Sequence, residues 1–246
     1  MFYLVNQVLI AAGGHGRRMS SSVNTTNSKP LIEYAGQPML GHLFDVLLET
    51  GIESYIVSAG YHNYEIIKDI VKKKKVDAQV LPVSHGGFRR IPYYVQDLLE
   101  DQFMFLCGHQ PLSRQFLMEM IRTANIYDCA FTSYNNSEYP SGMYLRVLFE
   151  GDPNSPQFKR VDTRSERVSH GHKYAINPFL ATRQIVKISK EDKFQHHFGQ
   201  YIFHHWMDGG SVGVVETSMP PEFDYDHEFE RTKKFLDDVQ QNVLTR

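Results

Sequence analysis

The sequence predicts an α/β fold built on a mixed, mainly parallel β-sheet with helices on both faces. Short apolar runs alternate along the first half of the chain with segments whose apolar residues recur at helical spacing. The first run, Val8–Ala12, is continuously apolar and stops at glycines, which is typical of a strand buried on both faces. Strands that alternate with helices in this way form parallel sheets.

The expected elements follow in chain order. The apolar runs predict strands at residues 8–12, 54–58, 78–83, 103–107 and 129–134. Helical spacing of the apolar residues predicts helices at 39–48, 66–71, 91–99 and 116–124. Beyond residue 140 the alternation weakens, and we expect strands at 144–150, 173–177 and 211–216 and a closing helix at 227–243.

Length and composition indicate one cytoplasmic domain covering residues 1–246. The net charge of -2 argues against nucleic acid as a partner, because such binding needs a clustered excess of Lys and Arg. No apolar run approaches the length that spans a bilayer, so we expect no membrane contact. Cys107 and Cys129 lie in apolar stretches and are expected to be buried, reduced thiols.

The loop after Ala12 carries the main chemical signal. Three glycines, Gly13, Gly14 and Gly16, let the backbone turn tightly and point its N–H groups at a ligand. Arg18 and Lys29 add positive charge of the kind that phosphate groups need. Since ligands of such sheets bind beyond the carboxyl ends of the strands, we expect a phosphate site here. The plain alternative is a tight turn with two solvated cations.

The order and spacing of these residues resemble those of the sugar-phosphate nucleotidyltransferases. That family opens with a strand and A-G-G-x-G-T-R-L, followed by P-K-P and then by G-K-P-M before a helix. The present sequence has Ala12-Gly13-Gly14-His15-Gly16-Arg17-Arg18-Met19, then Ser28-Lys29-Pro30, then Gly36-Gln37-Pro38-Met39. Arg17 stands where the family usually has Thr. The resemblance implies a Rossmann-like, GT-A-like fold, with residues 1–135 binding the nucleotide and 136–246 binding the acceptor.

The resemblance also implies roles for individual residues. Ala12, Gly13, Gly14 and Gly16 would lie against the nucleotide, Arg18 would bind the β- and γ-phosphates, and Lys29 would stabilise the α-phosphate under attack. Gly86 and Gly87 lie in the loop with which the family binds the base. An ordinary strand-to-helix turn explains those two glycines equally well.

The expected metal site departs from the family at one position. Nucleotidyl transfer needs a divalent cation, Mg²⁺ or alternatively Mn²⁺ or another metal, and the family holds it with an Asp in a Gly-Asp step and a late Asp. Here the step is Gly108-His109, and imidazole suits softer metals than Mg²⁺. Three interpretations stay open. The late carboxylate and the phosphates alone could hold the metal, or the protein could use a softer metal. Alternatively, catalysis has been lost and nucleotide binding has been kept.

Asp226 matches the late Asp of the family, and Asp224 is the reserve candidate. The alternative role for this pair is to cap the closing helix, since Asp is a favoured N-cap residue.

These observations favour an enzyme that joins a nucleoside triphosphate to a sugar 1-phosphate, or to a similar phosphorylated acceptor, and releases pyrophosphate. Two other classes stay open: a non-catalytic nucleotide or nucleotide-sugar binding protein, and a glycosyltransferase of related fold. An aromatic- and His-rich segment near residues 196–206 predicts a packing helix, with a homo-oligomer contact as a further hypothesis.

Overall fold

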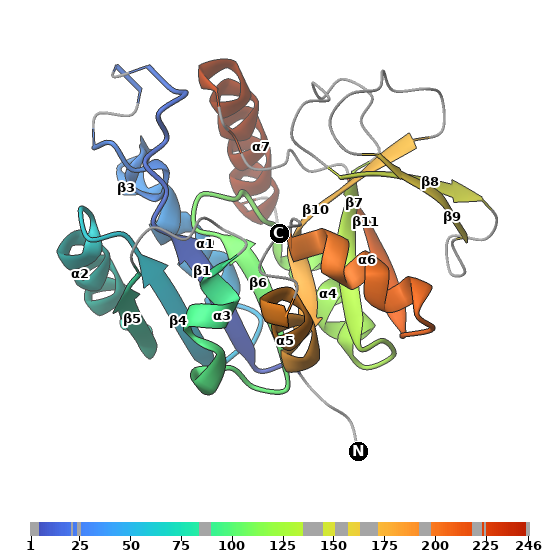
Figure 1. Cartoon of the computed structure of the whole chain (residues 1–246). Helices are drawn as coiled ribbons and strands as arrows, with labels where there is room; N and C mark the ends of the chain where they lie inside the picture. Colours follow the sequence, from blue (N-terminus) through green and yellow to red (C-terminus); the bar gives the residue numbers. More distant parts are fainter. Residues whose placement is uncertain are drawn as a thin grey trace.

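A computed structural model describes residues 5–20, 22–23, 26–83, 90–134, 145–150, 157–162, 172–191, 198–217, 223 and 225–244. These residues form one main sheet with strand order β11-β7-β10-β6-β1-β4-β5 (Figure 1). The strands, in chain order, are β1 (Gln7–Ala12), β4 (Ser54–Ala59), β5 (Ala78–Pro82), β6 (Gln102–Cys107), β7 (Cys129–Tyr134), β10 (His172–Thr182) and β11 (Val212–Thr217).

The sheet is mixed and mainly parallel, as predicted. The central strand β1 pairs in parallel with β4 and β6, β4 pairs in parallel with β5, and β11 with β7. The long strand β10 runs antiparallel between β6 and β7. Two further strands, β8 (Leu145–Glu150) and β9 (Gln157–Asp162), extend from it, since β10 pairs with β8 and β8 with β9. A separate small hairpin is made by β2 (Glu33–Tyr34) and β3 (Gln37–Pro38).

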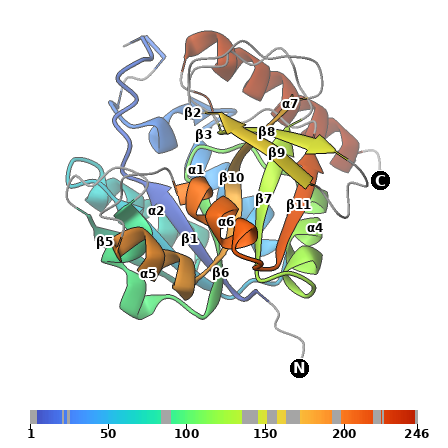
Figure 2. The same cartoon turned by 45° about the vertical axis from the view of Figure 1, so that its right-hand side comes forward.

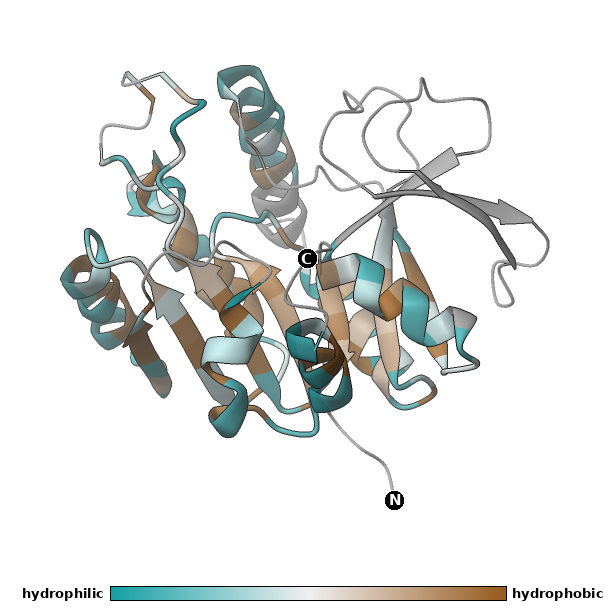
Figure 3. Cartoon of the chain, in the orientation of Figure 1, coloured by the Kyte–Doolittle hydropathy of each residue, from teal (hydrophilic) through white to brown (hydrophobic). Residues whose placement is uncertain are grey.

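Helices cover both faces of the sheet because its strands are apolar on both sides. All of β1 is buried, with Val8 and Ile10 in one hydrophobic cluster and Leu9 in the other. The first cluster includes α1 (Met39–Leu48), α2 (Tyr64–Lys74) and α4 (Arg114–Ala124). The second includes α3 (Ile91–Tyr94), α5 (Arg183–Glu191) and α6 (Phe198–Met207). Figure 3 shows the resulting apolar strands between helices with polar outer surfaces.

In the first half of the chain, the predicted strands and helices lie close to their expected positions, although the β2-β3 hairpin was not predicted and one helix differs. The helix expected at 91–99 is divided into α3 and a 3₁₀ turn, η3 (Gln96–Leu98). Val95 leaves the helical region at φ -113° and ψ 13°, which ends α3 there.

The second half departs further from the prediction. The strand expected at 173–177 continues to Thr182, past Pro178, and α5 follows at once. Proline is normally excluded from strand interiors, but the pairing of β10 with β7 shifts register between Ile176 and Phe179, which accommodates it. Strand β9 was not predicted, because its segment is polar, and neither was α5.

The predicted helix near residues 196–206 is largely α6. Its Phe198, Tyr201 and Ile202 are buried against the sheet, which confirms a packing helix, whereas residues 196–197 lie outside the described part. Both cysteines are free and buried, as expected. Among the described residues, no helix is long and apolar enough to cross a membrane.

The last helix, α7 (Asp226–Leu244), lies above the β2-β3 hairpin in Figure 2, and its Phe235 packs against the first hydrophobic cluster. It packs through a third hydrophobic cluster that contains Met19, Ile32, Met39, Phe223, Phe229 and Leu236. This cluster joins the end of the chain to the segments that follow β1.

Prediction for the core. Leu106 is fully buried in β6, so Leu106→Ala should lower the free energy of unfolding by about 2–5 kcal/mol. The matched change Leu98→Ala, at a leucine that is 41% exposed, should cost less than about 1 kcal/mol. Urea titration of both variants checks the difference, and equal losses would contradict the assigned core.

Candidate functional site

Three loops meet at the carboxyl ends of β6, β1 and β4, because these strands are parallel neighbours. The loop after β6 begins at Gly108, whose N–H donates to the carbonyl of Ala11 at 2.8 Å. A Cβ at Gly108 would lie 3.1 Å from the Cβ of Ala12, so a side chain there would crowd the end of β1. The site predicted at this edge of the sheet is therefore closely packed at its base.

The glycines of the loop after β1 differ in what the backbone needs from them. Gly16 has a φ of 63°, a conformation that L side chains rarely adopt. Gly13 passes so close to the turn after β4 that a Cβ would lie 3.1 Å from the backbone N of Gly60. Gly14 is exposed, and a Cβ there would meet nothing within 4 Å. Gly14 therefore leaves open space beside the backbone at the site.

The predicted cations lie in two different settings. Arg17 and Arg18 are exposed on the loop. Lys29 begins a 3₁₀ turn, η1 (Lys29–Leu31), and is buried, with only 8% of its surface exposed. A buried lysine beside a glycine-rich loop suits an anionic ligand.

His109 lies in the turn just after β6, where it is buried close to Lys29. Its ring packs edge-on against Phe223, with ring centroids 5.2 Å apart. Burial holds the pKa of His109 well below 6.5, and the charge of Lys29 lowers it further. The imidazole is therefore neutral at physiological pH.

Asp226 contacts the loop directly, although the two lie far apart in the sequence. Its Oδ1 accepts the backbone N–H of Ser20 at 3.1 Å. The backbone N–H of Tyr225, just before α7, is instead bound by Glu228 Oε2 at 3.1 Å. Asp226 is the first residue of α7 rather than its N-cap, and its carboxylate faces the glycine-rich loop.

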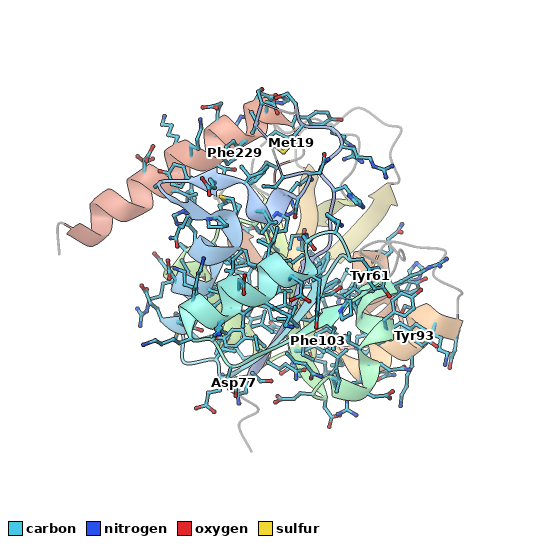
Figure 4. All side chains as sticks on the ribbon, turned by 90° about the vertical axis from the view of Figure 1, so that its left-hand side faces the viewer. Met19, Tyr61, Asp77, Tyr93, Phe103 and Phe229 are labelled. Carbon is cyan, nitrogen blue, oxygen red and sulfur yellow. The ribbon has the colours of Figure 1, made fainter. Side chains whose placement is uncertain are left out.

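Helix α7 holds the far side of the loop through apolar and polar contacts. Met19 and Phe229 lie side by side in Figure 4 and share one hydrophobic cluster. The hydroxyl of Tyr34 donates to the carboxylate of Asp237 on the same helix. Burial and this carboxylate raise the pKa of Tyr34 to about 12, so the tyrosine stays protonated and keeps donating.

The described residues fit a divalent metal only in part. A carboxylate oxygen of Asp226 is a donor that Mg²⁺ accepts readily. The neutral ring of His109 is enclosed by Phe223 and faces the positive charge of Lys29, an environment unfavourable to a second cation. Within the described ranges, no three His, Cys, Asp or Glu side chains gather to hold a metal ion. Asp224, the reserve candidate, lies outside those ranges, as do Gly86 and Gly87.

Two sets of buried polar residues at this edge were missed by the sequence analysis. Asn63, in the turn after β4, donates to the carbonyl of Ala12 and to the hydroxyl of Ser28. Gln110 and Asn177 bind one another, and Asn177 also donates to the sulfur of Cys107. The available signal was the position of Asn63 and Gln110, both polar residues within four positions of the end of a buried parallel strand.

Comparison with known proteins identifies the type of domain. Residues 8–187 match the MobA-like NTP transferase domain. The 3-deoxy-manno-octulosonate cytidylyltransferase of Haemophilus influenzae (strain PittGG) is 22% identical over 185 residues, which cover 71% of this chain and 68% of that protein. The bifunctional protein GlmU of Methylobacillus flagellatus is 26% identical over 222 residues, or 86% of this chain and 46% of that protein. The chain thus spans less than half the length of GlmU.

Two solved structures share the fold across nearly the whole chain. The inositol-1-phosphate CTP transferase from T. maritima superposes with a TM-score of 0.75 at 13% identity and covers 95% of this chain and 97% of its own. A putative glucose-1-phosphate thymidylyltransferase from Bacillus anthracis gives a TM-score of 0.74, also at 13% identity, with coverages of 93% and 94%. These likenesses establish the Rossmann-like nucleotidyltransferase fold.

Prediction for His109. Because its pKa is depressed in the folded protein, unfolding takes up a proton at this residue below pH 6.5. Its contribution to stability is complete above pH 6.5 and is lost as the pH falls toward the folded-state pKa. His109→Leu removes this group, so the variant should lose less thermal stability than the native protein between pH 6.5 and 5. Melting temperatures across that interval measure the difference, and parallel curves would show that His109 is not buried as a neutral ring.

Proposed function

The chain belongs to the family of MobA-like NTP transferase domains, and we propose on that premise that it transfers a nucleotidyl group to a sugar 1-phosphate or a similar phosphorylated acceptor. An oxygen of the acceptor phosphate attacks the α-phosphorus of a nucleoside triphosphate. The bond from the α-phosphorus to the oxygen that bridges to the β-phosphorus breaks, and pyrophosphate leaves. No covalent enzyme intermediate is needed.

The buried Lys29 next to the glycine-rich loop carries this proposal. In the proposed complex, the backbone of Gly13, Gly14 and Gly16 faces the triphosphate, and Arg18 contacts the β- and γ-phosphates. The Lys29 ammonium neutralises the negative charge that builds on the α-phosphate in the transition state. Such a reaction is accelerated mainly by positioning and charge neutralisation, both of which these residues offer.

The names of the relatives support the acceptor class. The H. influenzae relative is a cytidylyltransferase for 3-deoxy-manno-octulosonate, and the titles of the two similar structures name inositol-1-phosphate and glucose-1-phosphate. We assign the first part of the chain, residues 1–135, to the nucleotide and residues 136–246 to the acceptor. Gly86 and Gly87 are proposed to contact the base.

A divalent ion completes the proposal. Nucleotidyltransferases of this family generally use one. We propose that the ion is Mg²⁺, with Mn²⁺ as an alternative. Asp226 and phosphate oxygens of the bound triphosphate would hold it, with Asp224 as a further ligand. When bound, the ion would offset phosphate charge. His109 is proposed as a further ligand only for a softer metal such as Mn²⁺, because its ring is neutral but lies near the positive charge of Lys29.

Cellular location and assembly are part of the proposal as well. Two buried free thiols, Cys107 and Cys129, are typical of a reducing compartment, and we place the protein in the cytoplasm. The partners are the triphosphate and the acceptor phosphate, with no nucleic acid. A homo-oligomer through the aromatic residues at the end of α6 remains a hypothesis that a monomeric mass in solution would overturn.

Test of the activity. Pyrophosphate release should be measured with ATP, GTP, CTP, UTP and dTTP, each with a pool of sugar 1-phosphates and phosphocholine, in Mg²⁺ and in Mn²⁺ separately. We expect acceptor-dependent release with at least one triphosphate. Release only by His109→Asp would indicate a binding protein descended from an enzyme. Tighter binding of a nucleotide sugar than of any triphosphate, without release, would favour a glycosyltransferase.

Prediction for Lys29. Lys29→Met keeps the length of the side chain and removes its charge, so kcat should fall by about 10²–10³-fold, the usual loss when one group that stabilises transition-state charge is removed. Lys72→Met, at an exposed lysine in the last turn of α2, is the matched control and should leave kcat unchanged. Steady-state assays of pyrophosphate release compare the two, and similar values of kcat would exclude Lys29 from the reaction.

A further inference from the structure

The turn after β4 holds a buried amide at the base of the glycine-rich loop. Asn63 is 1% exposed. Its Oδ1 accepts the backbone N–H of Gly60 at 2.9 Å, and its own backbone N–H donates to the carbonyl of Gly60 at 3.1 Å. Residues 60–63 are thereby closed into a compact turn, and the amide nitrogen of the side chain is left to bind other segments.

That nitrogen joins the two ends of the loop after β1. Asn63 Nδ2 donates to the carbonyl of Ala12 at 2.8 Å and to the hydroxyl of Ser28 at 2.6 Å. Ala12 is the last residue of β1, and Ser28 directly precedes Lys29. One side chain therefore fixes where the loop leaves the sheet and where it returns to place the buried lysine.

The amide does not also serve the helix that follows. Asn63 is the N-cap residue of α2, a position where Asn normally binds the first free backbone N–H groups of the helix, yet its side chain makes no such bond. Its hydrogen-bonding capacity is directed to the turn and to the loop instead. Removal of the side chain should consequently affect the loop more than α2.

The same turn contacts the loop at two other places. The ring of His62 stacks on that of His15, with ring centroids 3.9 Å apart and an interplanar angle of 17°. The backbone at Gly60 meets Gly13, where a Cβ would lie 3.1 Å from the Gly60 nitrogen. The turn therefore contacts the loop in its first residues and at its end.

We propose that Asn63 is a positioning residue for the triphosphate site, which holds Lys29 and the glycine-rich loop in register by binding Ala12 and Ser28 at the same time. The inference rests on the proposed function, because it assumes that this loop binds a triphosphate. Asn63 is buried and acts through the backbone and Ser28, without contact to the substrate.

The test is triphosphate binding by Asn63→Ala, measured by isothermal titration calorimetry with ATP, GTP, CTP, UTP and dTTP. We expect the Kd of whichever triphosphate the native protein binds to rise about 10- to 100-fold, as is usual when buried hydrogen bonds that organise a site are lost. The KM of the acceptor should change little, because its part of the site lies elsewhere.

Gln7→Ala is the matched control. Gln7 is also a buried amide at an end of β1 with three hydrogen bonds: to Ser54 Oγ at 3.3 Å, to the carbonyl of Leu98 at 3.0 Å and from the N–H of Glu100 at 2.8 Å. It lies at the amino end of the strand, away from the site. Gln7→Ala should lower the melting temperature about as much as Asn63→Ala while the Kd stays at the native value. Equal weakening by both variants would show general loss of stability and overturn the inference.

Ser28→Ala gives a second, milder test that does not depend on the folding of Asn63→Ala. It removes one of the two loop contacts and should raise the Kd by a smaller factor. In the double variant with both Asn63→Ala and Ser28→Ala, the rise in Kd should equal that of Asn63→Ala alone, because both changes break the same Asn63–Ser28 hydrogen bond. Additive losses, or an unchanged Kd in every variant, would overturn the role of Asn63. A native protein that binds no triphosphate would overturn the proposed function itself.

Discussion

The close contact between the loop after β1 and the turn after β4 is the constraint on which the site depends. The two backbones approach at Gly13 and Gly60, where a Cβ would lie 3.1 Å from the Gly60 nitrogen. This approach brings the Asn63 amide within reach of Ala12 and Ser28, and so fixes the point at which Lys29 enters the buried region. A flexible loop would leave that ammonium in water, where its charge is screened and contributes little to a reaction.

The charge of the site follows from this arrangement and from the neutral ring of His109. The imidazole is buried just after β6, so it offers no negative charge to Lys29. The carboxylate of Asp226 comes instead from the opposite end of the chain and is tied to the loop through Ser20. Helix α7 therefore contributes to the site both a charged group and the apolar contacts that cover Met19. The proposed phosphate site thus combines a buried lysine, a neutral imidazole and one carboxylate.

The sequence predicts the parts of the fold that repeat a simple local pattern. Strands such as β1 and β6 are apolar on both faces, and α1 shows a clear helical spacing, so their positions agree with the prediction within a residue or two. Strand β9 has no apolar pattern, and Pro178 conceals the continuation of β10. The glycine-rich loop and Lys29 are visible because they are local motifs. The contacts of Asn63 are not, since they join residues 51 and 35 positions away, and the bond from Ser20 to Asp226 spans 206.

In the proposed mechanism, the carboxyl end of β1 binds a triphosphate with Lys29 at its α-phosphate. The most direct test is a crystal structure of the protein with an α,β-methylene analogue of the triphosphate that it turns over, which cannot be cleaved at the reacting bond. We expect density for the phosphates against the backbone of residues 13–18, with Lys29 Nζ in contact with the α-phosphate. An analogue bound away from this loop, or bound here with Lys29 turned toward His109 and without phosphate contact, would contradict it.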